Sequence, residues 1–127
     1  MDYLKNHSKD LGLLTLRFFV GMMMIFPHGW VKAANFMQRM DTFPDPLGIG
    51  STLSLTGTVF TEVVCSIMII LGIKTRLFSA PLLFTMLVAG FIVHANDPWK
   101  VKEKAILFGV TYLVLMITGG GKFSVRD

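Results

Sequence analysis

The sequence predicts an all-α fold: a bundle of four transmembrane helices, with a short interfacial segment between the first two. The chain of 127 residues is 53% hydrophobic and 16% charged, which leaves too few polar residues to coat a water-soluble globule of this size. The apolar residues also gather in long runs, and about 20 apolar helical residues match a hydrocarbon core of roughly 30 Å. We therefore expect a single membrane domain over residues 1–127.

The predicted spans cover approximately residues 11–30, 52–73, 77–95 and 102–119. The first contains one charged residue, Arg17, the second contains Glu62, and the third is uncharged up to His94 near its end. The fourth apolar run is short, and it reaches a spanning length if it begins at Lys102, whose long side chain can extend to the interface. The first run is too long for the core of a signal peptide, so we expect it to remain in the mature protein.

The connections between the runs are marked by proline, glycine and amphipathic segments. Pro27 removes a backbone donor and should kink or end the first helix near His28. Residues 32–40 alternate apolar and polar faces, which predicts a short surface helix. Residues 41–50 contain two prolines and two glycines and should form a loop, while the glycines at 119–121 should end the last helix.

The distribution of Lys and Arg favours a topology with both termini in the cytoplasm. Six of these residues lie in the two terminal tails and the turn after the second span, against five in the other two connections. Because positive charge favours the cytoplasmic side, this small excess indicates an even number of spans. No basic stripe with interleaved aromatic residues is present, so the net charge of +4 indicates contact with the lipid bilayer rather than with nucleic acid.

Titratable side chains within or beside the apolar runs are the candidate functional residues. A charge at the centre of a bilayer costs about 2.5 to 3.5 kcal/mol, so such residues are rarely kept without a use. Helical spacing places Arg17 and His28 on nearly the same face of the first span. Glu62 should lie within a turn or two of Arg17 in depth, so we expect these two side chains to pair inside the bundle. His28, His94 and Glu103 should lie together near the outer surface.

Two interpretations of these residues are open. Arg17 and Glu62 can form a structural ion pair that orients two helices, or Glu62 can carry protons or bind a ligand. His28 and His94 can be amphipathic residues at the interface, or they can relay protons or contact a ligand with Glu103 beside them. They could also bind a metal or haem iron, but two histidines without the spacing of a known ligand motif are weak support for such a site.

A series of short motifs runs through nearly the whole chain. It comprises Leu16, Arg17, Gly21, His28, Gly29 and Lys32, then Thr61, Glu62, Gly72, Thr75 and Arg76, and finally His94, Lys102, Glu103, Ser124 and Asp127. In this order the motifs resemble the DoxX family of small bacterial membrane proteins. The resemblance implies a four-helix bundle in the bacterial inner membrane. It also implies a link, known for some relatives, to quinone-dependent oxidation of sulfur compounds or to oxidative-stress and thiol-redox complexes.

We therefore expect an integral inner-membrane protein that serves as a redox-linked subunit, associated with quinone or with thiol and oxidative-stress chemistry. In this hypothesis Arg17 and Glu62 line a site for a quinone-like head group, while His28 and His94 stabilise or protonate it. The chain has a single cysteine and no Cys-x-x-Cys pair. Electrons would therefore come from a cofactor or a redox partner protein, and quinone binding calls for that partner or a homo-oligomer.

Two other functions are compatible with the sequence. The first is a non-catalytic membrane anchor or assembly subunit, whose basic surfaces recruit soluble partners. The second is a small carrier or channel, for which a single intramembrane carboxylate is weak support. Whether the protein is itself an enzyme is not determined by these residues.

Overall fold

The structure is a computed structural model that describes residues 2–127, which form helices joined by turns and one longer loop. The first long helix comprises α2 (Ser8–Met24), the π-helical turn η1 (Ile25–Trp30) and α3 (Val31–Ala34). The second comprises α5 (Ser51–Val59), η2 (Phe60–Cys65) and α6 (Ser66–Leu71). The third comprises α7 (Thr75–Val88) and η3 (Ala89–Val93), and the fourth is α8 (Trp99–Thr118). The short helices are α1 (Asp2–Asn6) and α4 (Phe36–Arg39).

The described residues contain three helices that are long and apolar enough to cross a membrane: Ser8–Ala34, Ser51–Leu71 and Thr75–Val93. They correspond to the first three predicted spans, and the first helix extends past the predicted end at residue 30. The fourth helix, α8, has 20 residues but carries four charged side chains in its first turns. The all-helical class is therefore confirmed, while the count of four membrane spans stays a prediction.

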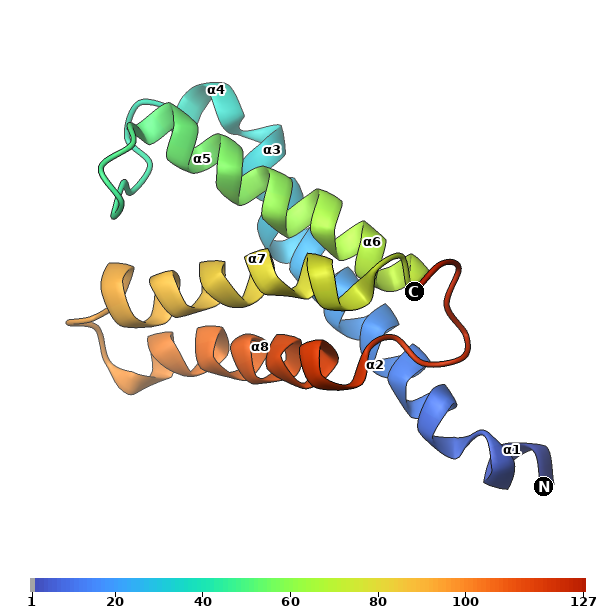
Figure 1. Cartoon of the computed structure of the whole chain (residues 1–127). Coiled ribbons are helices and arrows are strands. Elements are labelled where there is room, and N and C mark those ends of the chain that lie inside the picture. The colour runs from blue at the N-terminus through green and yellow to red at the C-terminus, as the bar shows by residue number, and fades with distance from the viewer. Residues whose placement is uncertain (1) are drawn as a thin grey trace.

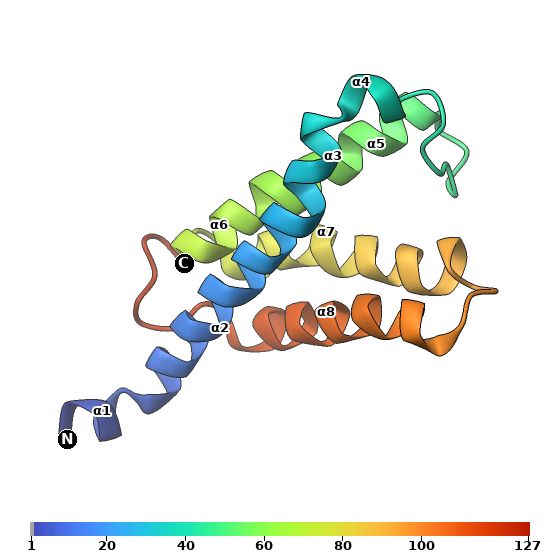
Figure 2. The ribbon, with the colours of Figure 1, turned by 180° about the vertical axis from the view of Figure 1, so that it is seen from behind.

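The helices are arranged as two crossing layers (Figures 1 and 2). In both views α7 and α8 lie side by side as an antiparallel hairpin, and the first and second long helices cross this hairpin at an angle. Within the crossing pair, α2 packs against α6 and η1 packs against η2. The core between the layers is formed by Val20, Met24, Cys65, Ile69, Leu82, Met86, Ala105, Tyr112 and Leu115. All four long helices therefore share one apolar core.

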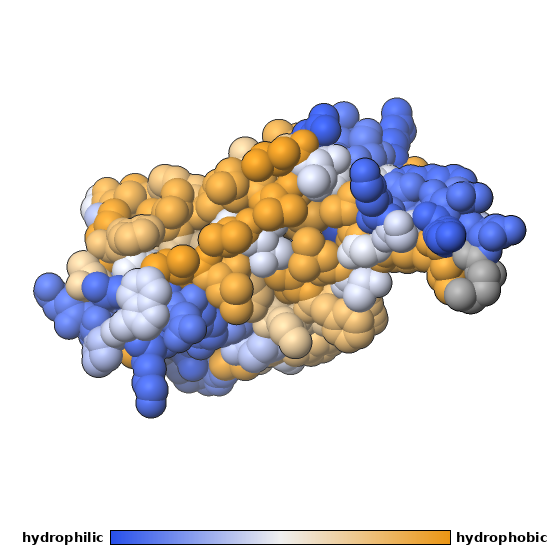
Figure 3. Space-filling view, turned by 90° about the horizontal axis from the view of Figure 1, so that it is seen from below, coloured by the Kyte–Doolittle hydropathy of each residue, from blue (hydrophilic) through white to orange (hydrophobic). Residues whose placement is uncertain are grey.

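The outside of the bundle is also apolar. Large hydrophobic side chains on all four long helices are more than half exposed, among them Phe19, Phe60, Phe84, Phe91 and Leu107. On the face drawn in Figure 3, hydrophobic residues occupy the middle and hydrophilic residues gather at the two ends. Water-soluble monomers rarely expose apolar patches of this extent, whereas acyl chains are a suitable solvent for them.

Pro27 lies within η1 and does not end the first helix, which continues to Ala34. A proline leaves one carbonyl of the preceding turn without its usual donor, and a widened π-helical turn is one way to accommodate that loss. Of the two outcomes expected at Pro27, a kink or an end, the end is therefore wrong. The predicted surface helix over 32–40 is correspondingly reduced, because its first residues belong to α3 and α4 supplies a single short turn.

The turn between α6 and α7 requires glycine at position 72. The φ angle of Gly72 is 75°, in the left-handed region where a Cβ is unfavourable. A Cβ at this position would also collide with Nη1 of Arg17 and would lie 2.7 Å from the Cα of Ser124. Gly72 therefore permits both the left-handed helix end and the close approach of Arg17.

We expect Gly72→Ala to lower the free energy of unfolding by about 1 to 3 kcal/mol, since it combines a strained φ angle with a steric clash. The measurement is thermal unfolding of the purified protein in detergent. Gly57→Ala is the matched control, because a Cβ at Gly57 meets open space inside α5 and should raise stability by about 0.5 to 1 kcal/mol. Equal melting temperatures for Gly72→Ala and Gly57→Ala would contradict the close contact at Gly72.

Candidate functional site

A buried ion pair forms the first charged centre of the bundle. Glu62, on η2, is 3% exposed, and its Oε1 lies 2.7 Å from Nζ of Lys32 on α3. The Lys32 side chain is 19% exposed, so water screens the pair little. Burying either charge alone would be costly, and the contact offsets part of that cost for both.

Glycine at position 29 brings the first helix close enough for this contact. A Cβ at Gly29 would lie 2.7 Å from Cγ2 of Val63 and 3.0 Å from Cβ of Glu62, so the two helix backbones meet at this point. Lys32 follows three residues later on the same helix face. The close approach at Gly29 therefore places the Lys32 ammonium beside the Glu62 carboxylate.

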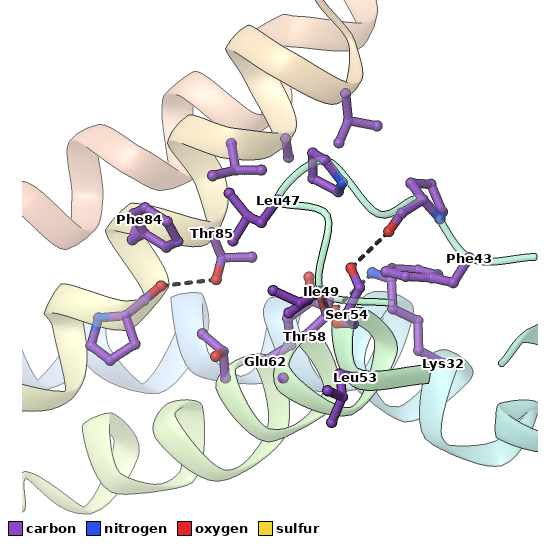
Figure 4. Close-up of a pocket in the computed structure, with 18 of the residues that line it drawn as sticks. Lys32, Phe43, Leu47, Ile49, Leu53, Ser54, Thr58, Glu62, Phe84 and Thr85 are labelled. Carbon is purple, nitrogen blue, oxygen red and sulfur yellow. Dashed lines mark hydrogen bonds and ion pairs between the residues drawn. The ribbon is translucent and has the colours of Figure 1, made fainter. Parts of the chain in front are cut away.

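A cavity of about 380 Å³ opens next to the ion pair, between α5, α7 and the loop over residues 43–49 (Figure 4). Its wall is mainly apolar and includes Phe43, Leu47, Ile49, Leu53, Phe84 and Val88. Polar contacts are available from Lys32, Glu62 and His94, which also line it. The cavity therefore joins a long apolar surface to a small charged region.

A second cavity, of about 150 Å³, also borders the pair. Its lining includes His28, Lys104 and Phe108 together with Lys32, Glu62 and His94. Lys32 and Glu62 line both cavities, as do Ala89 and His94, so the ion pair borders each of them. The π-helical turns η1, η2 and η3 each contribute to this lining, and such turns frequently mark functional sites.

The two histidines are held by specific neighbours. Nδ1 of His94 lies 2.6 Å from Oδ2 of Asp97, a contact that orients the imidazole ring. The His28 ring packs edge-to-face on Phe108, with 5.8 Å between the ring centroids. Both histidines therefore border the smaller cavity in fixed orientations, as groups that can exchange protons or hydrogen bonds with a ligand.

Arg17 does not belong to this site, and the expected Arg17–Glu62 pair is wrong. The Arg17 side chain is fully buried, and its guanidinium donates from Nη1 to Oγ of Ser124 at 2.8 Å and from Nη2 to the Phe123 carbonyl. The reason is helix register, since Gly29 rather than Arg17 lies opposite Glu62. Residues 17 and 29 are about 18 Å apart along a helix, beyond the reach of a guanidinium.

Arg17 instead anchors the tail, defined as residues 119–127, which folds back against the end of the bundle (Figure 1). Within the tail, the side-chain carboxylate of Asp127 accepts hydrogen bonds from the backbone N–H groups of Thr75, at 3.0 Å, and Gly120, at 2.9 Å. It thereby caps the first turn of α7. Backbone bonds from Val125 to Leu71 and from Arg126 to Gly72 complete the attachment.

Glu103 is exposed on α8 and lines neither cavity. The next residue, Lys104, lines the smaller cavity together with His28 and His94. Lys32 and Lys104 were absent from the candidate residues. The signals for Lys32 in the sequence are its position one turn after His28 and its place among the motif residues. Among residues 2–127, no three His, Cys, Asp or Glu side chains converge as a metal-binding group.

Together these features define a helical membrane protein with charged groups inside an apolar bundle. The family model for DoxX matches residues 12–95, and the protein belongs to the DoxX family. It is similar to an uncharacterized protein of Haemophilus influenzae, with 28% identity over 126 residues that cover 93% of this chain and 83% of the relative. No solved structure matches this chain.

A double-mutant cycle checks which cation pairs with Glu62. Lys32→Met should lower the free energy of unfolding by about 3 to 5 kcal/mol, because it leaves an uncompensated buried carboxylate. Adding Glu62→Met should recover most of that loss, whereas Glu62→Met should not rescue Arg17→Met. The free energy of unfolding of each variant is measured by thermal unfolding in detergent. Lys104→Met, at an exposed position, is the control. Rescue of the Arg17 variant instead would contradict the pairing seen here.

The attachment of the tail should depend on pH. Burial opposes ionisation of Asp127, but hydrogen bonds from Gly120 and Thr75 and the charge of Arg17 outweigh it and lower the pKa of the carboxyl. Its contribution to stability is therefore present above the unfolded pKa of about 3.9 and is lost as the pH falls through the lower folded pKa. Melting temperatures measured from about pH 6 to pH 2 should show Asp127→Asn less stable than wild type at the upper end, with the difference disappearing at the lower end. A constant difference would contradict this role of the carboxylate.

Proposed function

We propose that the protein is a redox-linked membrane subunit that binds a quinone-like molecule beside the Lys32–Glu62 pair. The observation that carries this proposal is a buried ion pair that lines a mainly apolar cavity of about 380 Å³. Ligand sites typically combine a largely apolar wall with a few polar groups, in volumes of roughly 300 to 1,000 Å³. A molecule with a polar ring and an apolar chain matches this division.

The polar groups are suited to a ring that carries oxygen atoms. The Lys32 ammonium can donate a hydrogen bond to a carbonyl oxygen, and the Glu62 carboxylate can accept one from a hydroxyl. His94, oriented by Asp97, faces the same cavity as a group that can donate or accept a proton. The apolar chain of the ligand would lie along Leu53 and Phe84.

Reduction of a quinone to a quinol consumes two electrons and two protons. The residues around the cavity can supply and accept protons, but the chain contains one cysteine, Cys65, which is buried and lies outside the cavity lining. The electrons must therefore come from elsewhere. We infer a redox partner protein that docks on the bundle or a homo-oligomer that shares the site.

The ligand would enter from the bilayer. Leu47 and Ile49, in the loop at the cavity mouth, are about half exposed. Figure 4 shows this loop on one side of the cavity and Phe84 of α7 on the other. An apolar opening between a helix and a loop suits a molecule dissolved in lipid.

The same proposal includes a bacterial inner-membrane location with α8 as the fourth span. A helix of 20 residues has a length of about 30 Å, and lysine side chains near its start can extend to the interface. The backbone N–H of Lys122 donates to Oδ1 of Asp10, so the two ends of the chain lie at the same end of the bundle. The small excess of basic residues at that end favours the cytoplasmic side.

Quinone binding can be measured as thermal stabilisation by decylubiquinone in detergent. A ligand at 100 times its Kd should stabilise the wild type by about 2.7 kcal/mol. We expect Glu62→Gln to lose this stabilisation, because it removes the carboxylate and its hold on Lys32. The matched control is Glu103→Gln, at an exposed position of α8 outside both cavities, which should respond as the wild type does. An equal response of both variants, or none in the wild type, would refute the site.

A further inference from the structure

Several polar groups inside the core have no protein partner in the part of the chain that the structure describes. The hydroxyls of Ser66, Thr75, Ser79 and Tyr112 are at most 1% exposed, and none forms a hydrogen bond. A buried polar group without a partner costs about 1 to 3 kcal/mol. In protein interiors, polar groups without a protein partner are generally hydrogen-bonded to ordered water. A buried water molecule typically makes about three hydrogen bonds.

These hydroxyls lie between the two charged centres rather than at random. Ser66 is one helical turn from Glu62, in the direction of Gly72, and Ser79 is one turn into α7 from Thr75. At about 1.5 Å per residue, Ser66 lies about 9 Å from the level of Gly72, and Ser79 about 6 Å from the level of Thr75. Because a short turn joins Gly72 to Thr75, the two serines lie at similar depths.

Tyr112 connects this level to the fourth helix. Its side chain is fully buried in the same apolar core as Cys65 and Leu82, and its hydroxyl faces Ser66. Neither oxygen has a partner at hydrogen-bonding geometry, although both can donate and accept. A water molecule that contacts both oxygens would satisfy both hydroxyls.

The polar groups continue to the Arg17 centre. A Cβ at Gly120 would lie 2.6 Å from Oγ1 of Thr75 and 3.0 Å from Nη1 of Arg17, so the hydroxyl and the guanidinium converge on that glycine. Nε of Arg17 is also buried without a partner in the described residues. Unsatisfied groups thus occur at each level from Arg17 to the turn next to Glu62.

We propose that bound water molecules bridge these groups and form a hydrogen-bonded chain that carries protons between the Arg17 end of the bundle and Glu62. Each hydroxyl or water in the chain accepts one proton and releases another, so no atom is consumed and no electron moves. While the Lys32 ammonium is bound to Oε1 of Glu62, the chain ends at this ion pair. The route extends the proposed function, because it would deliver protons to the quinone-like ligand, but it exists without that ligand.

The water can be detected with the two tyrosines of the chain. Tyr3 is 57% exposed and Tyr112 is fully buried, so a dry core should leave Tyr112 unmodified by hydroxyl radicals that X-ray pulses generate from water. We expect radical labelling of Tyr112 as well as Tyr3. The double variant Ser66→Ala/Ser79→Ala should lose the Tyr112 label and keep that of Tyr3. Wild-type protein labelled at Tyr3 alone would overturn the proposal.

Proton movement is measured in proteoliposomes that contain a pH-sensitive dye and an imposed membrane potential, with no quinone added. Lys32→Gln should raise proton flux above that of the wild type, because Glu62 is then free to take up and release protons. Lys32→Gln/Tyr112→Phe should lose the added flux. Lys32→Gln/Thr111→Val is the matched control and should retain it, since the Thr111 hydroxyl is already bonded to the Leu107 carbonyl.

Each outcome bears on the proposal. Added flux that disappears with the Tyr112 hydroxyl supports the route, and flux that is unchanged by Tyr112→Phe or absent from Lys32→Gln overturns it. If Lys32→Gln does not fold, the labelling of Tyr112 still decides whether water is present in the core. Because decylubiquinone is absent from both experiments, failure of quinone binding would leave these results unaffected.

Discussion

A carboxylate buried among apolar helices needs a compensating charge, and the Lys32–Glu62 ion pair meets that need. The rest of the site depends on it. Gly29 brings the first and second helices close enough for the contact, and the π-helical turns η1 and η2 lie at this crossing. The pair lines both cavities, so its charges are available to whatever occupies them.

A second charged centre, at the other end of the bundle, has a different role. The two Nη atoms of Arg17 donate to the tail, through Ser124 and the Phe123 carbonyl, and Asp127 ties the same tail to the start of α7. This centre closes one end of the bundle, whereas the Lys32–Glu62 pair borders open space. Buried charge thus attaches the tail at the Arg17 centre. At the Lys32–Glu62 pair, in our proposal, it binds a ligand.

Much of the fold could be predicted from the sequence because a bilayer requires every spanning segment to satisfy its own backbone, and hydropathy reports such segments directly. The last helix likewise ends at Thr118, where the predicted run of glycines begins. The charge pairing could not be predicted in this way. Arg17 and Lys32 share a helix face, and the choice between them depends on the register of two helices, which the contact at Gly29 determines. Nor does any periodicity indicate that the tail folds back onto Arg17.

The measurement that tests the Lys32–Glu62 pair most directly is solid-state nuclear magnetic resonance of the protein in lipid bilayers, with labelled side-chain nitrogens and carboxyl carbons. The 2.7 Å separation between Nζ of Lys32 and Oε1 of Glu62 predicts a strong dipolar contact between the ammonium nitrogen and the carboxyl carbon. That signal should vanish in Lys32→Met and persist in Arg17→Met. A contact between the Glu62 carboxyl carbon and the Arg17 guanidinium, or none to Lys32, would contradict the account.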